Sequence, residues 1–322
     1  MSGNDNRMEH RTLGPTGESV SALGFGTWPL AGMMGSVDRR HAVDLIRRAI
    51  DAGVTFIDTA EAYGDTEEIL GEALQEGYRD RCFLATKVSH DFTPSGVRSA
   101  AERSLLNMKT EVIDLYQLHR WESAVPLDET LRAVQELQDS GIVRHVGVSN
   151  FNTDRLAAAT DIAAVVSNQI NYNALNRAPE ERLLPAAFDA NVAILVHSSL
   201  AKGLLSGKYK PGHTFEAGDE RSSFPGYSGE PLKQYLAVVD ELGAVAADAG
   251  LSTAQAALVW LLARPEVTNV LIGPKTAKQL EESIGALEKT SPEDRVALRS
   301  RMDEVLERHG LEALCPFPDQ LV

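Results

Sequence analysis

Residues 127–148 read LDETLRAVQELQDSGIVRHVGV and join a helical pattern to a strand pattern. Leu131, Val134 and Leu137 share one face of the expected helix, while charged side chains occupy the opposite face. Gly141 stands where a glycine commonly ends a helix, and the β-rich run Val143–Val148 follows it directly. The stretch therefore predicts an amphipathic helix followed by a buried strand.

The same unit recurs along the chain, with amphipathic stretches such as 41–53 and 94–108 between short apolar runs. The eight expected strands are Val20–Gly26, Val54–Asp58, Cys82–Lys87, Val112–His119, Val143–Val148, Val165–Ile170, Val192–His197 and Val270–Gly273. Such α/β patterns are typical of two folds, an open doubly wound sheet and a closed (β/α)8 TIM barrel. We take the barrel as the predicted fold.

Three segments fall outside the repeated unit. Residues 8–21 predict an N-terminal β-hairpin that could plug the N-terminal end of the barrel. The long gap before the last strand holds the loop Gly203–Pro231 and a helix near 232–249, which we interpret as an insertion after strand seven. Residues 291–322 predict an extra C-terminal helix and a tail. No linker divides the chain, so we expect residues 1–322 to form a single domain.

Composition excludes several classes of function. The chain has 322 residues, with 31 basic and 46 acidic side chains and a formal net charge of -15, which argues against nucleic acid as a partner. No apolar run approaches the ~18 residues of a membrane span, and no signal peptide is apparent. Neither the two cysteines nor the eight histidines show metal-ligand spacing. We expect a cytoplasmic protein, a monomer or small homo-oligomer, with a small-molecule partner and no metal.

Ionisable residues end three consecutive expected strands. Asp58, Lys87 and His119 would lie at the carboxyl ends of the strands, where TIM barrels carry their active sites, and Tyr63 follows in the loop after Asp58. A carboxylate keeps a buried lysine charged, and a nearby cation lowers the pKa of a tyrosine from ~10 toward neutrality. An imidazole within reach can polarise the same oxygen. The set predicts proton transfer at a carbonyl or alcohol oxygen.

Several motifs make the chain similar to the aldo-keto reductases. The stretches GVTFIDTAEAYG (53–64), LATK (84–87), IDLYQLHR (113–120), GIVRHVGVSNF (141–151) and SNQINYN (167–173) resemble signatures of that family. The resemblance covers nearly the whole chain and implies a catalytic tetrad of Asp58, Tyr63, Lys87 and His119. It also implies reversible reduction of an aldehyde or ketone to an alcohol, by hydride transfer from a nicotinamide, with Tyr63 as the general acid or base.

The resemblance further implies a site for NADPH/NADP⁺, with NADH as the less favoured cofactor because Lys275 suits a 2′-phosphate. The residues implied are Gly26, Thr27, Trp28, Asp58, Ser149, Asn150 and Gln169 near the nicotinamide; His197, Ser198, Ser199, Leu200, Gly203 and Ser206 along its face and the pyrophosphate; and Gly273, Lys275, Thr276, Gln279 and Glu282 at the adenosine end. His197 and Ser283 depart from the residues common in the family. A titratable His197 predicts that the ratio of NADPH to NADP⁺ affinity rises as pH falls from about 8 to 5.5.

The predicted substrate pocket is a mostly apolar mouth, which suits aldehydes and ketones of mixed size. Its expected residues are Trp28, Met33, Tyr63, His119, Trp121, Phe224 and Tyr227. Two other functions remain as alternatives. One is a Schiff-base aldolase that uses Lys87, which would need a neutral amine. The other is a cofactor-binding sensor or regulatory barrel with negligible turnover.

Overall fold

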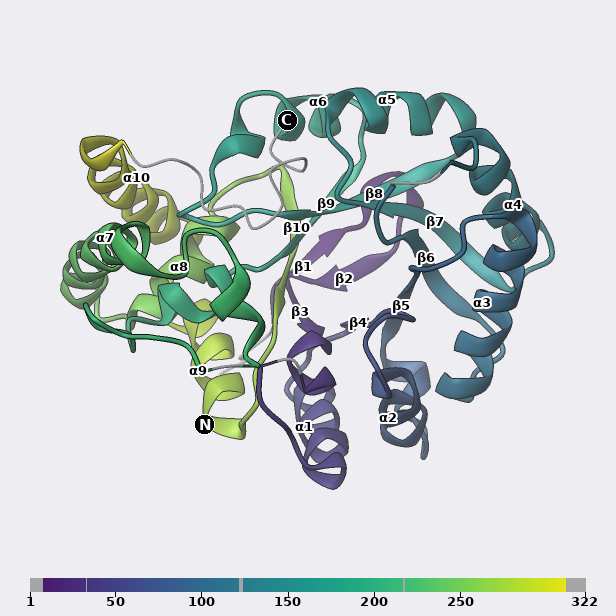
Figure 1. The fold of residues 1–322 in the computed structure, drawn as a ribbon, viewed down its shortest axis with the longest axis horizontal. Helices are drawn as coiled ribbons and strands as arrows, with labels where there is room; N and C mark the ends of the chain where they lie inside the picture. Colours follow the sequence, from purple (N-terminus) through teal and green to yellow (C-terminus); the bar gives the residue numbers. More distant parts are fainter. Residues whose placement is uncertain (1–7, 33, 122–123, 217, 311–322) are drawn as a thin grey trace, which may run out of the picture.

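The computed structural model describes residues 8–32, 34–121, 124–216 and 218–310, and within them it has the predicted TIM barrel. Eight parallel strands close in the order β10-β3-β4-β5-β6-β7-β8-β9 (Figure 1). Their bounds are β3 (Leu23–Gly26), β4 (Phe56–Asp58), β5 (Phe83–Val88), β6 (Ile113–Leu118), β7 (Val143–Ser149), β8 (Val165–Asn171), β9 (Ala193–His197) and β10 (Val267–Ile272). All eight predicted strands are therefore present, which settles the choice against an open sheet.

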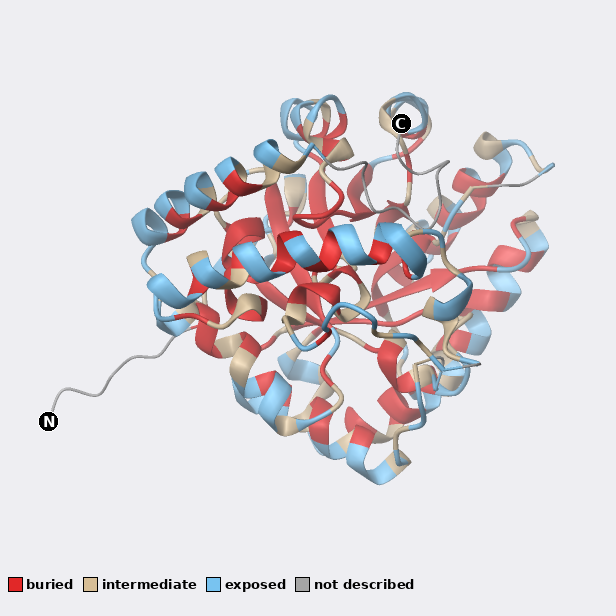
Figure 2. Ribbon diagram, turned by 60° about the vertical axis from the view of Figure 1, so that its left-hand side comes forward, coloured by how far each residue is buried: buried red, intermediate tan, exposed pale blue. Residues whose placement is uncertain are grey.

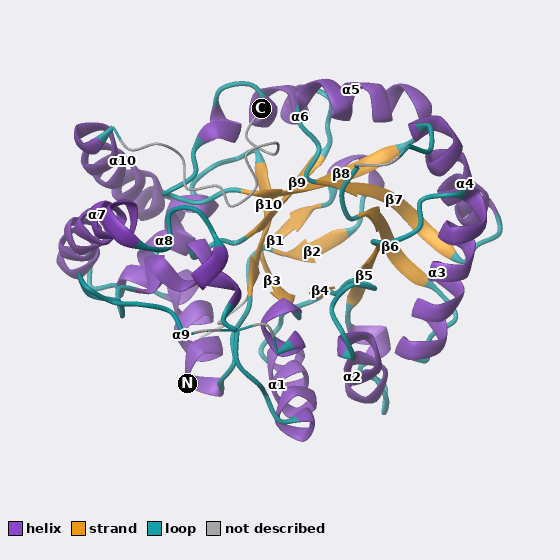
Figure 3. Ribbon diagram, in the orientation of Figure 1, coloured by secondary structure: helices purple, strands orange, loops and turns teal. Residues whose placement is uncertain are grey.

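Helices surround the strands, as Figure 3 shows. They are α1 (Arg39–Asp51), α2 (Thr66–Ala73), α3 (Pro94–Met108), α4 (Leu127–Asp139), α5 (Thr153–Ile162), α6 (Leu183–Asp189), α8 (Thr253–Leu262) and α9 (Ala277–Glu288). Each amphipathic helix turns its apolar side toward the barrel, so buried and exposed residues alternate along it (Figure 2). In α4, Leu131, Val134 and Leu137 are buried as their spacing predicts.

The N-terminal hairpin closes one end of the barrel. β1 (His10–Thr12) and β2 (Ser19–Ser21) pair antiparallel, and Leu13, just after β1, and Val20 of β2 are fully buried in a cluster with Phe56 and Phe83. A Cβ at Gly14 would lie 2.7 Å from the carbonyl oxygen of residue 166, so the turn sits directly against β8. The expected strand Val20–Gly26 is wrong at its start, because the chain leaves the hairpin at residue 22 before it enters β3.

The predicted insertion follows β9, the seventh barrel strand. It contains the short helices η5 (Ala201–Ser206) and η6 (Glu220–Ser223) and the long helix α7 (Gly229–Asp248). The extra helix α10 (Pro292–His309) packs against α7 and α8. Residues 311–322 of the expected tail lie outside the described residues.

Within the described ranges, no single helix is long and apolar enough to cross a membrane, although α7 and α8 together, bent by 84°, meet the length and composition test.

Alternation along the strands determines where polar groups can lie. Side chains at i and i+2 share one face of a strand. In β4, Phe56 lies in the apolar cluster near the hairpin, and Asp58 comes next on that face. In β6, Leu115 of the same cluster is followed by Gln117. The barrel interior therefore changes from apolar at the hairpin end to polar at the carboxyl ends of the strands.

Candidate active site

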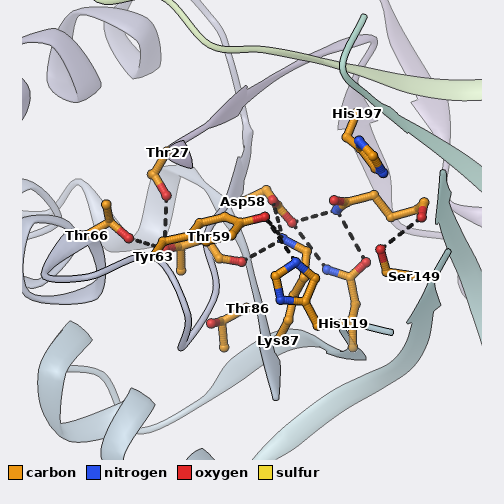
Figure 4. A network of polar contacts seen from close by, with 12 residues as sticks. Thr27, Asp58, Thr59, Tyr63, Thr66, Thr86, Lys87, His119, Ser149 and His197 are labelled. Atoms are coloured by element: carbon orange, nitrogen blue, oxygen red, sulfur yellow. Dashed lines mark hydrogen bonds and ion pairs between the residues drawn. The ribbon is translucent and has the colours of Figure 1, made fainter. Parts of the chain in front are cut away.

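A buried ion pair lies at the centre of the polar end. The Lys87 Nζ donates to Asp58 Oδ2 at 2.6 Å and to the Thr59 carbonyl oxygen at 2.8 Å, and the side chains of Lys87 and Asp58 are 0% and 3% exposed (Figure 4). Burial is the largest single effect on the pKa of Lys87 and lowers it, but the charges and hydrogen bonds of Asp58 and Tyr63 together outweigh burial, so the net direction is upward. Lys87 is therefore a charged ammonium at neutral pH.

Tyr63 completes a compact group of titratable side chains. Its hydroxyl is 3.4 Å from the Lys87 Nζ and 3.4 Å from the Nε2 of His119 (Figure 4). Burial raises the pKa of Tyr63, and the opposing effect of Lys87 does not reverse the shift. The expectation of a lowered tyrosine pKa is therefore wrong for this structure. Tyr63 keeps its proton at neutral pH, as a general acid requires.

His119 is held in a neutral state. Burial and the neighbouring Lys87 place its pKa well below its usual range. Its Nδ1 lies 2.7 Å from the hydroxyl of Ser89, a residue that follows β5 directly. The structure thus brings the four predicted residues of the tetrad together and adds a fifth side chain that the sequence analysis did not identify.

Amide and hydroxyl groups line the next part of the rim. Gln169 Nε2 donates to Asp58 Oδ1 at 2.7 Å, and Gln117 Nε2 donates to the same oxygen at 3.2 Å. The Ser149 hydroxyl donates to the Gln169 carbonyl oxygen at 2.9 Å and accepts from the Asn150 side chain at 3.0 Å. The three residues predicted to bind a carboxamide, Ser149, Asn150 and Gln169, therefore share one hydrogen-bonded cluster beside the ion pair.

His197 joins this cluster from β9. Its Nε2 lies 2.8 Å from Asn150 Oδ1, and its Nδ1 lies 3.0 Å from the hydroxyl of Ser198. Asn150 uses its side-chain nitrogen to donate to Ser149 and to the His119 carbonyl oxygen, which leaves its oxygen to accept from His197. Burial, with Lys87 nearby, lowers the pKa of His197 to about 3. The expectation that His197 titrates between about pH 8 and 5.5 is therefore wrong.

The loop after β9 has an unusual backbone. Ser198, Ala201 and Lys202 have positive φ values of 54°, 46° and 48°, a backbone conformation that residues other than glycine adopt uncommonly. Gly203 continues the loop at φ 97°, where glycine is favoured. Ser199 Oγ donates to the Leu271 carbonyl oxygen at 2.7 Å, which ties the loop to β10. The other predicted residues of the loop, Leu200 and Ser206, lie beside and within η5.

The predicted adenosine end lies after β10. Lys275 directs its Nζ to the carbonyl oxygens of Met34 and Gly35, and Arg221 and Lys208 are close enough to help lower its pKa, after burial as the main cause. Thr276 caps α9 by accepting from the Gln279 backbone, and the Gln279 side chain accepts from the Lys275 backbone at 2.7 Å.

Three more residues at the predicted adenosine end, Glu282, Ser283 and Gly273, contact neighbouring residues. The Glu282 carbonyl oxygen accepts from Gln255, and Ser283 donates to the Gln279 carbonyl oxygen. A Cβ at Gly273 would lie 2.5 Å from Pro29, so the chain passes close to the start of η2 (Trp28–Ala31).

The inserted loop crosses toward the first strand. Glu220 accepts from Lys202 at 2.7 Å and from the Trp28 ring nitrogen at 3.1 Å. The Trp28 ring meets the Tyr63 ring edge-on at 4.8 Å, and the Lys202 Nζ lies 4.9 Å above the Phe224 ring. Trp28 therefore contacts Tyr63 directly, and Phe224 is linked to Trp28 through the Lys202–Glu220 ion pair, which the sequence analysis missed.

Other predicted residues have different surroundings. Gly26 ends β3, and Thr27 after it donates its backbone N–H to the Asp58 carbonyl oxygen at 2.9 Å. Trp121 is half-buried against Phe92. Tyr227 is 2% exposed, and its hydroxyl donates to the Ala201 carbonyl oxygen in the loop after β9. Met33 lies outside the described residues.

No cluster of three or more possible metal ligands occurs in the part of the chain that the structure describes.

The residues that the sequence analysis missed differ in how they could have been found. Gln117 lies in β6 two positions before His119, and Ser89 lies just after β5, two positions after Lys87. Because side chains two positions apart share one face of a strand, alternation along the strands could have identified both. Glu220 had no such signal, because its position depends on the path of a long loop.

Comparisons with known proteins agree with this geometry. The model of the Aldo/keto reductase family matches residues 22–305. Aldo-keto reductase YhdN of Bacillus subtilis is 37% identical over 288 residues, covering 85% of this chain and 87% of the relative. L-glyceraldehyde 3-phosphate reductase of Escherichia coli is 32% identical, covering 87% and 88%. A solved glycerol dehydrogenase from Gluconobacter oxydans superposes with a TM-score of 0.85 at 30% identity, covering 96% and 98%.

Proposed function

Since the chain belongs to the Aldo/keto reductase family, we propose that it reduces an aldehyde or ketone with NADPH, or catalyses the reverse oxidation, with Tyr63 as the proton donor. The observation that carries the proposal is the buried Lys87 ammonium, held by Asp58 at 2.6 Å and directed at the Tyr63 hydroxyl at 3.4 Å. A proton donor beside a fixed cation is suited to an oxygen that gains negative charge.

The proposed chemistry needs one hydride and one proton. When bound, the nicotinamide cofactor supplies the hydride to the carbonyl carbon. Tyr63 donates its hydroxyl proton to the carbonyl oxygen, and Lys87 stabilises the negative charge that remains on the tyrosine oxygen. His119, neutral and 3.4 Å from the Tyr63 hydroxyl, donates a hydrogen bond to the same carbonyl oxygen and orients it.

The described residues fit such a cofactor at both ends. Ser149, Asn150 and Gln169 would offer amide and hydroxyl groups to a carboxamide, and the loop with positive φ at Ser198, Ala201 and Lys202 would lie along a pyrophosphate. At the far end Lys275, with Lys208 nearby, would give the positive charge that a 2′-phosphate needs, whereas the charge of the neighbouring Arg221 is balanced by its ion pair with Asp219. These contacts support NADPH ahead of NADH.

The substrate is proposed as a small carbonyl compound. Trp28 and Phe224 would make the mouth of the proposed site partly apolar, while Lys202 and Glu220 beside them are charged. Two relatives have names that concern three-carbon compounds, a glyceraldehyde 3-phosphate reductase and a glycerol dehydrogenase. Glyceraldehyde, its 3-phosphate and glycerol are therefore the first compounds to test, followed by apolar aldehydes and ketones.

The alternatives have less support. A Schiff-base aldolase needs Lys87 as a neutral amine, whereas Asp58 raises its pKa. A sensor without turnover would not need a proton donor beside a buried cation.

The deciding experiment follows loss of NADPH absorbance across a panel of carbonyl compounds, with NADH in parallel. We expect one alcohol formed for each NADPH consumed. Binding of NADPH without consumption by any compound would favour the sensor, and borohydride trapping of an aldehyde on Lys87 would favour the aldolase.

A further inference from the structure

We propose that Ser89 is a positioning residue that fixes the tautomer and the orientation of the His119 ring. This inference rests on the proposed function, because it concerns how His119 presents a hydrogen to the substrate oxygen. Ser89 follows β5 directly, two positions after Lys87, and is 7% exposed. Its hydroxyl lies 2.7 Å from Nδ1 of His119, on the opposite side of the ring from Tyr63.

The tautomer follows from the neighbours of the ring. A neutral imidazole carries one N–H, and the pKa of His119 lies well below its usual range because of burial and Lys87. In the proposed reaction the Tyr63 proton goes to the substrate oxygen, so His119 can share that oxygen only by donating from Nε2. Nδ1 must then accept a hydrogen bond. The Ser89 hydroxyl, at 2.7 Å, is placed to donate it.

Ser89 is itself held in place through the loop that carries Tyr63. Its backbone N–H donates to Glu61 Oε2 at 2.9 Å, and the other Glu61 oxygen pairs with Arg103 of α3. The Glu61 backbone N–H donates to the Lys87 carbonyl oxygen at 3.1 Å. Glu61, whose side chain is 11% exposed, thus connects the Tyr63 loop to the end of β5 through its backbone and to Ser89 through its carboxylate. Movement of Tyr63 relative to His119 is restricted by the same contacts.

The test measures the tautomer directly, by NMR of the imidazole nitrogens in the full-length protein. In the wild type we expect His119 to be protonated at Nε2 and unprotonated at Nδ1. In Ser89→Ala we expect a mixture of the two tautomers, because Nδ1 has lost its donor. Ser89→Thr keeps a hydroxyl and is expected to restore the Nε2–H form. A wild-type ring protonated at Nδ1 overturns the proposal, even if Ser89→Ala fails to fold.

Kinetics give the second readout. With a carbonyl substrate, Ser89→Ala is expected to lower kcat by roughly 5- to 150-fold, since a buried acceptor left unpaired costs roughly 1–3 kcal/mol. The affinity for NADPH should not change, and Ser89→Thr should recover most of the activity.

The matched control is Ser104→Ala in α3, because the Ser104 hydroxyl is buried with no hydrogen-bond partner among the described residues. Equal kcat in the wild type and Ser89→Ala, with the tautomer unchanged, overturns the proposal. A wild type that reduces no carbonyl would instead contradict the proposed function and leave the tautomer measurement valid.

Discussion

Replacing Asp58 with Asn removes the negative charge from the buried pair while keeping the size of the side chain. The Asn oxygen can still accept from Gln117 and Gln169, which now donate to Asp58 Oδ1 at 3.2 and 2.7 Å. The new amide nitrogen would face the Lys87 Nζ, now 2.6 Å from Asp58 Oδ2. A charged Lys87 cannot accept from that nitrogen, so we expect Lys87 to become neutral in the variant.

The cost can be worked out from that change. A lysine in the unfolded chain has a pKa of about 10.4, and removing its proton costs about 1.36 kcal/mol for each pH unit below that value. Folding with a neutral Lys87 therefore lowers the free energy of unfolding by about 4.6 kcal/mol at about pH 7. Removing one partner of a buried ion pair typically lowers stability by about 3–5 kcal/mol, and the value expected for Asp58→Asn lies in this range. Loss of the ammonium also removes the cation that stabilises the Tyr63 oxygen, so kcat should fall with stability.

The dependence on pH has a definite sign. In the wild type the folded pKa of Lys87 is raised, so its contribution to stability is complete below about pH 10.4 and is lost only as pH rises through the folded value. In Asp58→Asn the folded pKa is lowered, so the variant gains stability as pH rises toward the unfolded value. We therefore expect the difference in unfolding free energy to shrink by about 1.4 kcal/mol per pH unit between about pH 7 and 10.

Urea denaturation of both proteins across this range is the assay. Asp65→Asn is the matched control, because Asp65 pairs with Arg39 at the surface at 3.1 Å and exposed pairs contribute roughly 0–1 kcal/mol. Asp58→Asn combined with Lys87→Met should recover part of the stability, since no buried charge remains. A difference below about 1 kcal/mol at about pH 7, or one that does not vary with pH, would refute the reasoning.

Two further predictions concern the cofactor. Lys275→Ala should weaken NADPH about 10- to 100-fold and NADH much less, because a charge-assisted contact contributes about 1.5–3 kcal/mol; equal losses in binding titrations would show that Lys275 does not contact the 2′-phosphate. Because the pKa of His197 is about 3, the ratio of NADPH to NADP⁺ affinity should stay constant between about pH 8 and 5.5. Fluorescence titration measures this ratio, and a rise on acidification would mean that His197 takes up a proton in that range.

The parts of the fold that could be predicted from sequence depend on local patterns. Alternating apolar runs and glycines such as Gly141 mark the strands and helix ends because the patterns involve residues close in the chain. Asp58 and Lys87 could be assigned to one rim for the same reason, since Asp58 is the last residue of β4 and Lys87 the last but one of β5. We could also predict the hairpin, the insertion and the C-terminal helix, because these segments do not fit the repeated strand–helix unit.

The parts that could not be predicted depend on tertiary burial and loop paths. The pKa of Tyr63 rises, against expectation, because burial outweighs the nearby Lys87, and no sequence pattern gives the balance of the two. His197 stays neutral for a similar reason. The contacts of the Tyr227 ring with Phe215 and Phe224 also had no sequence signal, and the place of Tyr227 in the substrate pocket stays a prediction.

The central claim is that Tyr63 donates the proton, and a single-turnover measurement on Tyr63→Phe tests it most directly. The enzyme–NADPH complex is mixed with an aldehyde, and loss of the reduced nicotinamide is followed in time. Tyr116→Phe is the matched control, because the Tyr116 hydroxyl is also buried but donates to the Val97 carbonyl oxygen.

General acid catalysis typically contributes ~10²–10⁴ in rate, so we predict a loss of that size in Tyr63→Phe, with NADPH affinity nearly unchanged. A variant that keeps more than about a tenth of the wild-type rate, with the chemical step rate-limiting, would contradict the assignment of Tyr63 as the proton donor.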